Sequence, residues 1–344
     1  MEEDNLTVVL YLNGLRLEQR PIPEVDDFDV LLAIDTVAVG KSDLHYFVYG
    51  RPNPILFNIY SKDKNVIKPM VIGYESSGVV VKRGQKVSGL SVGDRVAIKA
   101  GFPCHYSDRC KEGKFCNCPE NVFCAFAPTD GTLTRYFKHP ADYCLKLPNH
   151  VTMEEGALVN LVATAVSSCS LGRLQPCSKL VICGAQPLGL VTLMVAQAMG
   201  VSQILVTDMK QHRLELAKEL GATHTLLEKS EQSDTEVVEH VREAFGDLAS
   251  AYIRTSYIGL ETLLTSEVLE SGGVLAISNP ASNARISSED YAQALSLVAS
   301  GKLNLKRLMS HHFDIEEAVQ AFETAKMDLE DVLKVMIHVK PRAK

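Results

Sequence analysis

Two stretches of the chain combine residue types that could do chemistry. The first is Gly184-Ala185-Gln186-Pro187-Leu188-Gly189, between a β-rich run (180–183) and a helical run (188–199). A glycine turn in this context binds a dinucleotide pyrophosphate at the helix N-terminus. Asp208 ends the next β-rich run, about 20 residues further on, where a carboxylate holds an adenosine ribose and disfavours a 2′-phosphate. The turn therefore points to NAD rather than NADP.

The middle position of this glycine turn departs from the dinucleotide pattern. A glycine there lets the backbone approach the pyrophosphate, whereas Gln186 carries a side chain into that space. We therefore expect NAD binding to be weak or absent, with Gly184, Gln186, Gly189, Asp208 and Arg213 as the candidate contacts. In the alternative interpretation, Gly184 and Gly189 remain only for turn geometry and for packing the helix on the strand.

The second stretch holds five of the nine cysteines, between Cys104 and Cys124. The N-terminus, Met1-Glu2-Glu3-Asp4-Asn5, lacks the basic and apolar segments of a secretory signal, so we expect a cytoplasmic protein. An odd number of cysteines in that compartment indicates reduced thiols or a metal site rather than disulfides.

Composition limits the classes of partner. The chain has 344 residues, a net charge of −7 and 46% hydrophobic residues, which is typical of a globular protein of two domains. This acidic balance argues against binding to nucleic acid or to an anionic membrane surface. The uncharged stretch 180–207 is long enough to span a bilayer, but its internal glycines and Pro187 predict a buried βαβ unit instead.

The elements that must position these residues change in kind near residue 150. Before it, short β-rich runs dominate (7–12, 30–39, 79–82, 95–98 and 143–147). After it, Thr152 and Glu155 have capping-box spacing and open a helical run to residue 170. Strand and helix patterns then alternate to residue 255, and helices at 288–299 and 314–325 and a strand at 332–339 follow. This alternation predicts an α/β domain with a doubly wound parallel sheet.

The stretch Gly73-Tyr74-Glu75-Ser76-Ser77-Gly78, followed by Gly93-Asp94-Arg95-Val96, resembles the zinc-dependent medium-chain dehydrogenases, and in particular their sorbitol (L-iditol 2-) dehydrogenase branch. The resemblance covers nearly the whole chain. It implies a GroES-like β domain made of residues 1–155 and 304–344. It also implies a Rossmann domain made of residues 156–303, with the active site in the cleft between the two domains.

The same resemblance identifies the positions of a catalytic zinc site. The branch holds this zinc with a cysteine, the histidine and glutamate of a G-H-E motif, and a second glutamate, and these positions are Gly40, Tyr74, Glu75 and Asn160 here. Three of the four ligand types are replaced. Because a catalytic zinc needs about three protein ligands and one open position, we expect no zinc at these residues.

Three hypotheses follow for the function. The first is a pseudoenzyme in which Tyr74 packs into the vacated metal cavity and the scaffold is kept to bind another protein or a small molecule. The second is an active NAD-dependent oxidoreductase. It would be either a polyol dehydrogenase with a rearranged site or a zinc-free carbonyl or quinone reductase, in which Tyr74 binds a carbonyl oxygen and Ser42 and His45 relay a proton. The third is a protein accumulated for bulk stability.

Many relatives also carry a structural zinc on C-x2-C-x2-C-x7-C. The corresponding residues here are Cys104, Ser107, Cys110 and Cys118, so one ligand is replaced. A structural zinc site would form if Cys116, His105 or Asp108 completes the set. In the alternative, these cysteines are reduced core residues.

Three further departures from the family bear on the cleft and on assembly. Residues 52–67 form a longer stretch than the branch suggests, and Arg254-Thr255-Ser256-Tyr257 brings large side chains to where the nicotinamide would pass. The segment 278–287 is too short for the family's last strand. We therefore expect no family-type homodimer through the sheet edge, and an edge strand at 274–277. The chain's own 279–286 loop would cover that edge, or another protein would pair with it.

Overall fold

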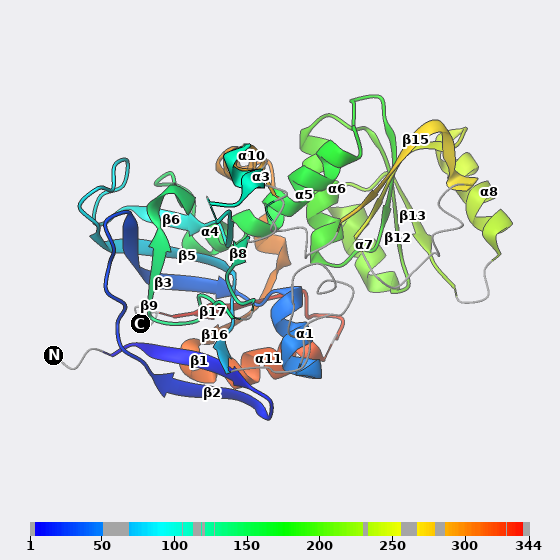
Figure 1. Ribbon diagram of the computed structural model, residues 1–344. Coiled ribbons are helices and arrows are strands. Elements are labelled where there is room, and N and C mark those ends of the chain that lie inside the picture. The colour runs from blue at the N-terminus through cyan, green and yellow to red at the C-terminus, as the bar shows by residue number, and fades with distance from the viewer. Residues whose placement is uncertain are drawn as a thin grey trace. The chain divides into compact units, whose positions relative to one another are not determined.

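The computed structural model in Figure 1 describes residues 4–50, 69–104, 106–112, 118, 121–126, 128–229, 233–255, 267–278, 286–327 and 329–339. It divides the chain into two compact units. The first combines Met1–Asn160, Pro280–Leu295 and Lys306–Lys344, and the second combines Leu161–Asn279 and Ser296–Leu305. The sequence-based division differs from this at three places, because it assigns 156–160 and 280–295 to the second domain and 304–305 to the first. Within the described ranges, no helix combines the length and the apolar character needed to cross a membrane.

The first unit is built on a sheet that joins the two ends of the chain. Its strand order is β10-β6-β5-β3-β17-β16, and β9 also pairs with β3. The C-terminal β17 runs antiparallel to β3 and parallel to β16, so the last strands complete the β domain of the N-terminal half. The bounds are β3 Asp29–Ala38, β5 Glu75–Arg83, β6 Arg95–Ile98, β9 Tyr136–Pro140, β10 Cys144–Lys146, β16 Met309–Asp314 and β17 Lys334–His338.

Smaller elements complete this unit. A second sheet has the order β2-β1-β4, and β7 pairs with β8. One hydrophobic core is shared by the seven-stranded sheet and the sheet β2-β1-β4 of this unit. It includes Leu10, Ile34, Tyr46 and Phe322. The bounds are β1 Leu6–Tyr11, β2 Gly14–Gln19, β4 Met70–Val71, β7 Gly101–Phe102, β8 Val122–Phe123, α1 Lys41–Tyr49, α3 Asp108–Lys111, α4 Met153–Ala157, α10 Ser288–Ala299 and α11 Ala318–Lys326.

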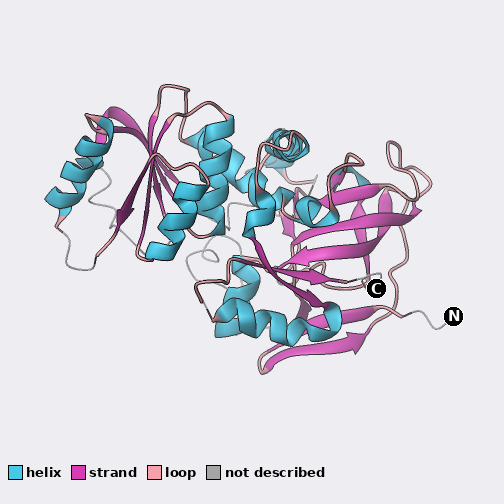
Figure 2. Cartoon of the chain, turned by 180° about the vertical axis from the view of Figure 1, so that it is seen from behind, coloured by secondary structure: helices cyan, strands magenta, loops and turns pink. Residues whose placement is uncertain are grey.

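The second unit is the expected doubly wound parallel sheet. Its order is β13-β12-β11-β14-β15, with every pairing parallel. Figures 1 and 2 show α8 on one face of the sheet and α5 and α6 on the other. The bounds are β11 Lys179–Cys183, β12 Gln203–Asp208, β13 His224–Leu227, β14 Ala249–Arg254, β15 Leu269–Ile277, α5 Val159–Leu171, α6 Pro187–Ala198, α7 Gln211–Glu219 and α8 Asp234–Phe245.

The sequence patterns missed or merged several elements. The β-rich pattern before residue 150 gave no indication of α1. This helix is rich in aromatic side chains and is stabilised by the packing of Phe47 on Phe322 of α11. The single helical run expected from residue 152 is two helices, α4 and α5, which meet at Leu158. The helix expected from residue 314 opens with a 3₁₀ turn, Ile315–Glu317, before α11.

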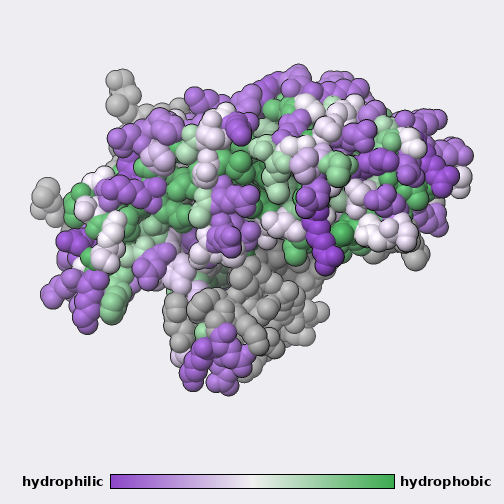
Figure 3. Space-filling view, turned by 90° about the horizontal axis from the view of Figure 1, so that it is seen from above, coloured by the Kyte–Doolittle hydropathy of each residue, from purple (hydrophilic) through white to green (hydrophobic). Residues whose placement is uncertain are grey.

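The surface carries hydrophilic side chains over much of the face shown in Figure 3, with hydrophobic side chains between them. Some large apolar side chains are nevertheless exposed at the end of the second unit's sheet. In β15, the last strand of the described order, Leu275 is 37% exposed and Ile277 is 50% exposed. The strand expected at 274–277 is therefore an edge strand among the described residues.

A substitution at Phe322 tests whether α11 belongs to the core of the first unit. Its side chain is 1% exposed, so Phe322→Ala should lower the free energy of unfolding by about 3 to 5 kcal/mol through lost burial and a residual cavity. Val319→Ala, on the exposed side of the same helix, is the control and should change it by less than about 0.5 kcal/mol. Urea unfolding measures both, and equal effects would contradict this packing.

Candidate active site

Gly40 and Tyr74 form a sterically matched pair in the first unit. Gly40 precedes α1, and Tyr74 precedes β5. A Cβ atom built on Gly40 would lie 2.4 Å from Cε1 of Tyr74 and 2.5 Å from its Cζ and Oη. Such distances are far below van der Waals contact, so the tyrosine ring occupies the space that any side chain at position 40 would need.

The ring of Tyr74 is fully enclosed. It is 2% exposed and packs with a small cluster that includes Ala100 and Phe123, whose ring centroid lies 5.6 Å away. The phenol hydrogen-bonds to Ser42. Burial, together with the nearby carboxylates, raises the pKa of Tyr74 well above its ordinary value of 10.0. The phenol is therefore a packed, protonated group and a weak proton donor.

Asp43 holds the two turns that bring Gly40 and Tyr74 together. Its Oδ1 accepts a hydrogen bond from the backbone N–H of Gly73 at 2.9 Å, and its Oδ2 accepts one from that of Gly40 at 3.2 Å. Burial raises the pKa of Asp43 to about 7, although these two hydrogen bonds oppose the shift. Two residues further along α1, the centroid of the His45 ring lies 4.6 Å from that of the Tyr49 ring.

Glu75 and Asn160, the other two candidate zinc positions, are engaged by side chains of the same unit. The Nζ of Lys334 lies 2.7 Å from Oε2 of Glu75, and both side chains are buried. Burial raises the pKa of Glu75, and the Lys334 ammonium acts in the opposite direction. The hydroxyl of Tyr291 donates a hydrogen bond to Oδ1 of Asn160.

These four positions do not fit a catalytic zinc ion. Gly40 offers no ligand atom, Tyr74 fills the adjoining space, and the carboxylate of Glu75 already faces a cation of the chain. Sequence reasoning missed Lys334, although a single lysine inside the apolar run 332–339 was a usable signal, because a buried lysine requires an anionic partner.

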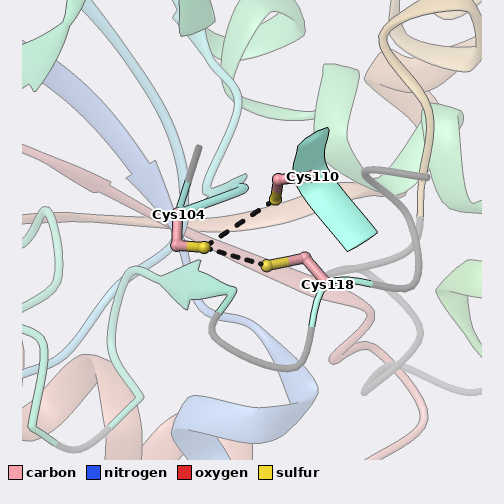
Figure 4. Close-up of side chains that lie close together, drawn as sticks. All are labelled: Cys104, Cys110 and Cys118. Atoms are coloured by element: carbon pink, nitrogen blue, oxygen red, sulfur yellow. Dashed lines mark hydrogen bonds between the residues drawn. The ribbon is translucent and has the colours of Figure 1, made fainter. Parts of the chain in front are cut away.

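The cysteine-rich stretch brings together three of its predicted residues. Figure 4 shows the sulfur atoms of Cys104, Cys110 and Cys118 turned toward one another. Sγ of Cys104 lies 3.8 Å from that of Cys110 and 3.4 Å from that of Cys118. A tetrahedral zinc with Zn–S bonds of about 2.3 Å separates its sulfurs by about 3.8 Å. The three thiols therefore fit a zinc ion geometrically.

Ser107 stands where the fourth ligand of the structural zinc pattern would be. Its hydroxyl caps α3 by accepting the N–H of Cys110 at 3.4 Å. Burial acts to raise the pKa of Cys104, but hydrogen bonds from the side chain and backbone of Ser107 lower it to about 6. Cys116 and His105 lie outside the described residues, and Asp108 points to solvent and contacts Lys111. A structural zinc on these thiols remains a prediction.

The glycine turn of the second unit has the backbone geometry of its motif. Gly184 has a φ of +100°, and a Cβ on Gly189 would lie 1.8 Å from the carbonyl oxygen of Gly184. Gln186 is the N-cap residue of α6, at the position where a pyrophosphate would approach. Thr255 donates a hydrogen bond to the carbonyl oxygen of Gly184 at 3.0 Å. Ser256 and Tyr257 lie outside the described residues.

Asp208 is engaged by its own surroundings. Its Oδ2 accepts the N–H of Ala185 at 2.7 Å, and its Oδ1 accepts the N–H of Lys210 at 2.9 Å. The guanidinium of Arg213 lies 3.6 Å from the same Oδ1. The carboxylate predicted to hold a ribose therefore stabilises the turn itself, and a ribose would have to share these oxygens.

Comparison with known proteins assigns the family. The family model "Alcohol dehydrogenase GroES-like domain" matches residues 26–149, and "Zinc-binding dehydrogenase" matches residues 187–301. Sorbitol dehydrogenases of Mus musculus and Homo sapiens are each 38% identical, over 98% of this chain and 97% of theirs. The chain belongs to the sorbitol dehydrogenase family.

The solved structures agree on the fold of this sorbitol dehydrogenase relative. An Escherichia coli oxidoreductase of unknown specificity superposes with a TM-score of 0.84 at 27% identity, covering 98% of this chain and 99% of that one. An alcohol dehydrogenase from a Thermus species gives 0.81 at 23% identity, covering 97% and 100%. The GroES-like and Rossmann-type architecture expected from the sequence is confirmed.

The contact between Gly40 and Tyr74 is testable by a double-mutant cycle. Gly40→Ala should lower the free energy of unfolding by about 1 to 3 kcal/mol, because the added methyl group collides with the tyrosine ring. In a Tyr74→Ala background the same substitution should cost much less, since the ring is gone. Equal costs in both backgrounds, measured by urea unfolding, would show that the ring does not occupy this space.

Because folding raises the pKa of Asp43, this residue should make the free energy of unfolding fall with rising pH, whereas a carboxylate with a lowered pKa makes it rise. Its folded pKa of about 7 exceeds the ordinary 3.8, so between these values the folded state holds a proton that the unfolded state has lost. The free energy of unfolding should therefore fall as pH rises through this window. Urea unfolding across the window should show a flatter profile for Asp43→Asn. Val319→Ala, which removes no titratable group, should leave the slope unchanged.

Proposed function

We propose that this sorbitol dehydrogenase relative no longer oxidises polyols through a catalytic zinc and is retained as a binding scaffold. The observation that carries the proposal is the ring of Tyr74, which fills the space beside Gly40 where a ligand side chain would stand. The Lys334–Glu75 ion pair supports it, because it neutralises the remaining ligand-type residue.

Loss of the metal removes the main chemical driving force of alcohol oxidation. A zinc ion lowers the pKa of a bound alcohol and stabilises the developing alkoxide by several kcal/mol. None of the four residues at positions 40, 74, 75 and 160 can act on an alcohol as a Lewis acid in the way that zinc does. The raised pKa of Tyr74 also makes it a poor substitute in a zinc-free reductase.

The proposal extends to the cofactor, for which we infer weak NAD binding. Gln186 is the N-cap residue of α6, where the dinucleotide motif has a glycine that lets the pyrophosphate approach. Both oxygens of Asp208 accept backbone hydrogen bonds, from Ala185 and Lys210. A bound ribose would compete with these interactions. The turn would then serve mainly to connect β11 to α6.

Another protein is the partner class that the scaffold proposal favours. The exposed Leu275 and Ile277 lie on β15, at the end of the described strand order in the second unit. An apolar edge strand can accept a strand from another chain by main-chain hydrogen bonding. The short segment 278–287, which leaves no room for the family's last strand, favours a heteromeric partner over a family-type homodimer.

Enzyme assays test the catalytic part of the proposal. We expect no NAD-dependent oxidation of sorbitol or xylitol above background, with or without added zinc, and only weak binding in an NADH titration. A sorbitol dehydrogenase of the same family, assayed in parallel, controls for the conditions. Turnover that survives chelation of metals and disappears in Tyr74→Phe would instead establish a zinc-free enzyme.

A further inference from the structure

A cluster of two histidines and a glutamate lies in the first unit, apart from the positions discussed so far. Glu154 is in the first turn of α4, His312 is in β16, and His338 ends β17. Oε1 of Glu154 lies 3.0 Å from Nδ1 of His312 and 3.2 Å from Nε2 of His338. The two nitrogen atoms are 3.2 Å apart. The three atoms thus form a nearly equilateral triangle.

The fold holds these side chains in register. In the parallel pairing of β16 with β17, His312 is opposite Met336 and Asp314 is opposite His338. The two imidazole rings are nearly parallel, with an interplanar angle of 11° and centroids 5.5 Å apart. The adjacent Glu155 forms the capping box of α4 with Thr152, so the helix end is stabilised without the carboxylate of Glu154.

We propose that Glu154, His312 and His338 bind a divalent transition-metal ion, with zinc as the best-fitting ion. Imidazole nitrogen and carboxylate oxygen are ordinary zinc ligands, with bonds of about 2.0 to 2.2 Å. A tetrahedral ion with such bonds separates its ligand atoms by about 3.3 to 3.6 Å. The observed separations of 3.0 to 3.2 Å need to widen only by a few tenths of an ångström.

The surroundings leave room for the fourth ligand. The side chains of Glu154 and His312 are 30% and 31% exposed, and that of His338 is 13% exposed. The open corner of the tetrahedron would therefore face water. These residues share no ligand with the three cysteines or with positions 40, 74, 75 and 160, so this site is independent of the proposed function.

A bound ion would connect segments that are far apart in the sequence. Glu154 belongs to the helix that follows the N-terminal β domain, whereas the histidines belong to the last two strands. An ion that binds only the folded chain stabilises it by mass action. Binding should also weaken on acidification, because both imidazoles must be neutral to coordinate.

The competing explanation is an ordinary hydrogen-bond network. One oxygen of Glu154 can accept an N–H from each histidine, which accounts for the two short N–O distances without an ion. In that arrangement both facing nitrogens carry protons and offer no lone pair to a metal. The two explanations therefore differ in a measurable property, the affinity for zinc.

The experiment is a zinc chloride titration of full-length protein freed of metal by chelation, followed by calorimetry and by the thermal unfolding midpoint. His312→Ala, His338→Ala and Glu154→Gln should each weaken zinc binding at this site by at least about ten-fold and reduce the zinc-induced rise in midpoint. His311→Ala is the matched control, since this neighbouring histidine faces Asp331 instead. It should retain the wild-type response.

Cobalt(II) provides a second measurement that separates this site from the cysteine cluster. Cobalt on the three thiols gives a thiolate charge-transfer band, whereas cobalt on nitrogen and oxygen ligands gives only ligand-field absorption. We expect a ligand-field component that is lost in His312→Ala and kept in Cys104→Ser. Identical zinc affinity and cobalt spectra in wild type, His312→Ala and His338→Ala would overturn the proposal and leave the hydrogen-bond network.

Discussion

Excluded volume between one glycine and one tyrosine determines what the candidate active site can do. With Tyr74 enclosed among Ala100, Phe123 and their neighbours, the ring has one position, and that position requires hydrogen alone as the side chain of residue 40. Asp43 fixes the geometry by accepting the N–H groups of Gly40 and Gly73 with its two oxygens. A side chain at position 40 therefore cannot be accommodated while the tyrosine ring is in place.

Buried charge imposes the second constraint on this region. A buried carboxylate needs a cation or several hydrogen-bond donors, and a buried amide needs hydrogen-bond partners. Three buried groups of this region satisfy these needs in different ways. Glu75 uses Lys334, Asp43 uses backbone donors and has a raised pKa, and Asn160 accepts from Tyr291. Each of these three groups thus has a partner within the chain, without a metal ion.

The sequence predicted the architecture well because its strongest signals are local. Alternating β-rich and helical runs with glycine punctuation are sufficient for the parallel sheet of the second unit, and the family motifs fix the first. The helix α1 was missed because its stability comes from contact with α11, and the contacting residues Phe47 and Phe322 are 275 residues apart in the sequence. The partners Lys334 and Tyr291, and the group of Glu154 with His312 and His338, were missed for the same reason. Sequence spacing identifies positions, but it does not identify which distant side chain meets them.

Several residues that indicate a cofactor site in the sequence also stabilise the fold when no cofactor is bound. A side chain at Gly189 would strike the carbonyl oxygen of Gly184, so this glycine is required by the close passage of helix over strand whether or not a dinucleotide binds. Asp208 likewise stabilises the turn by accepting the N–H of Ala185. Selection for stability is sufficient to keep both residues. Gln186 is the informative position, because the dinucleotide motif has a glycine there that leaves open space for a pyrophosphate.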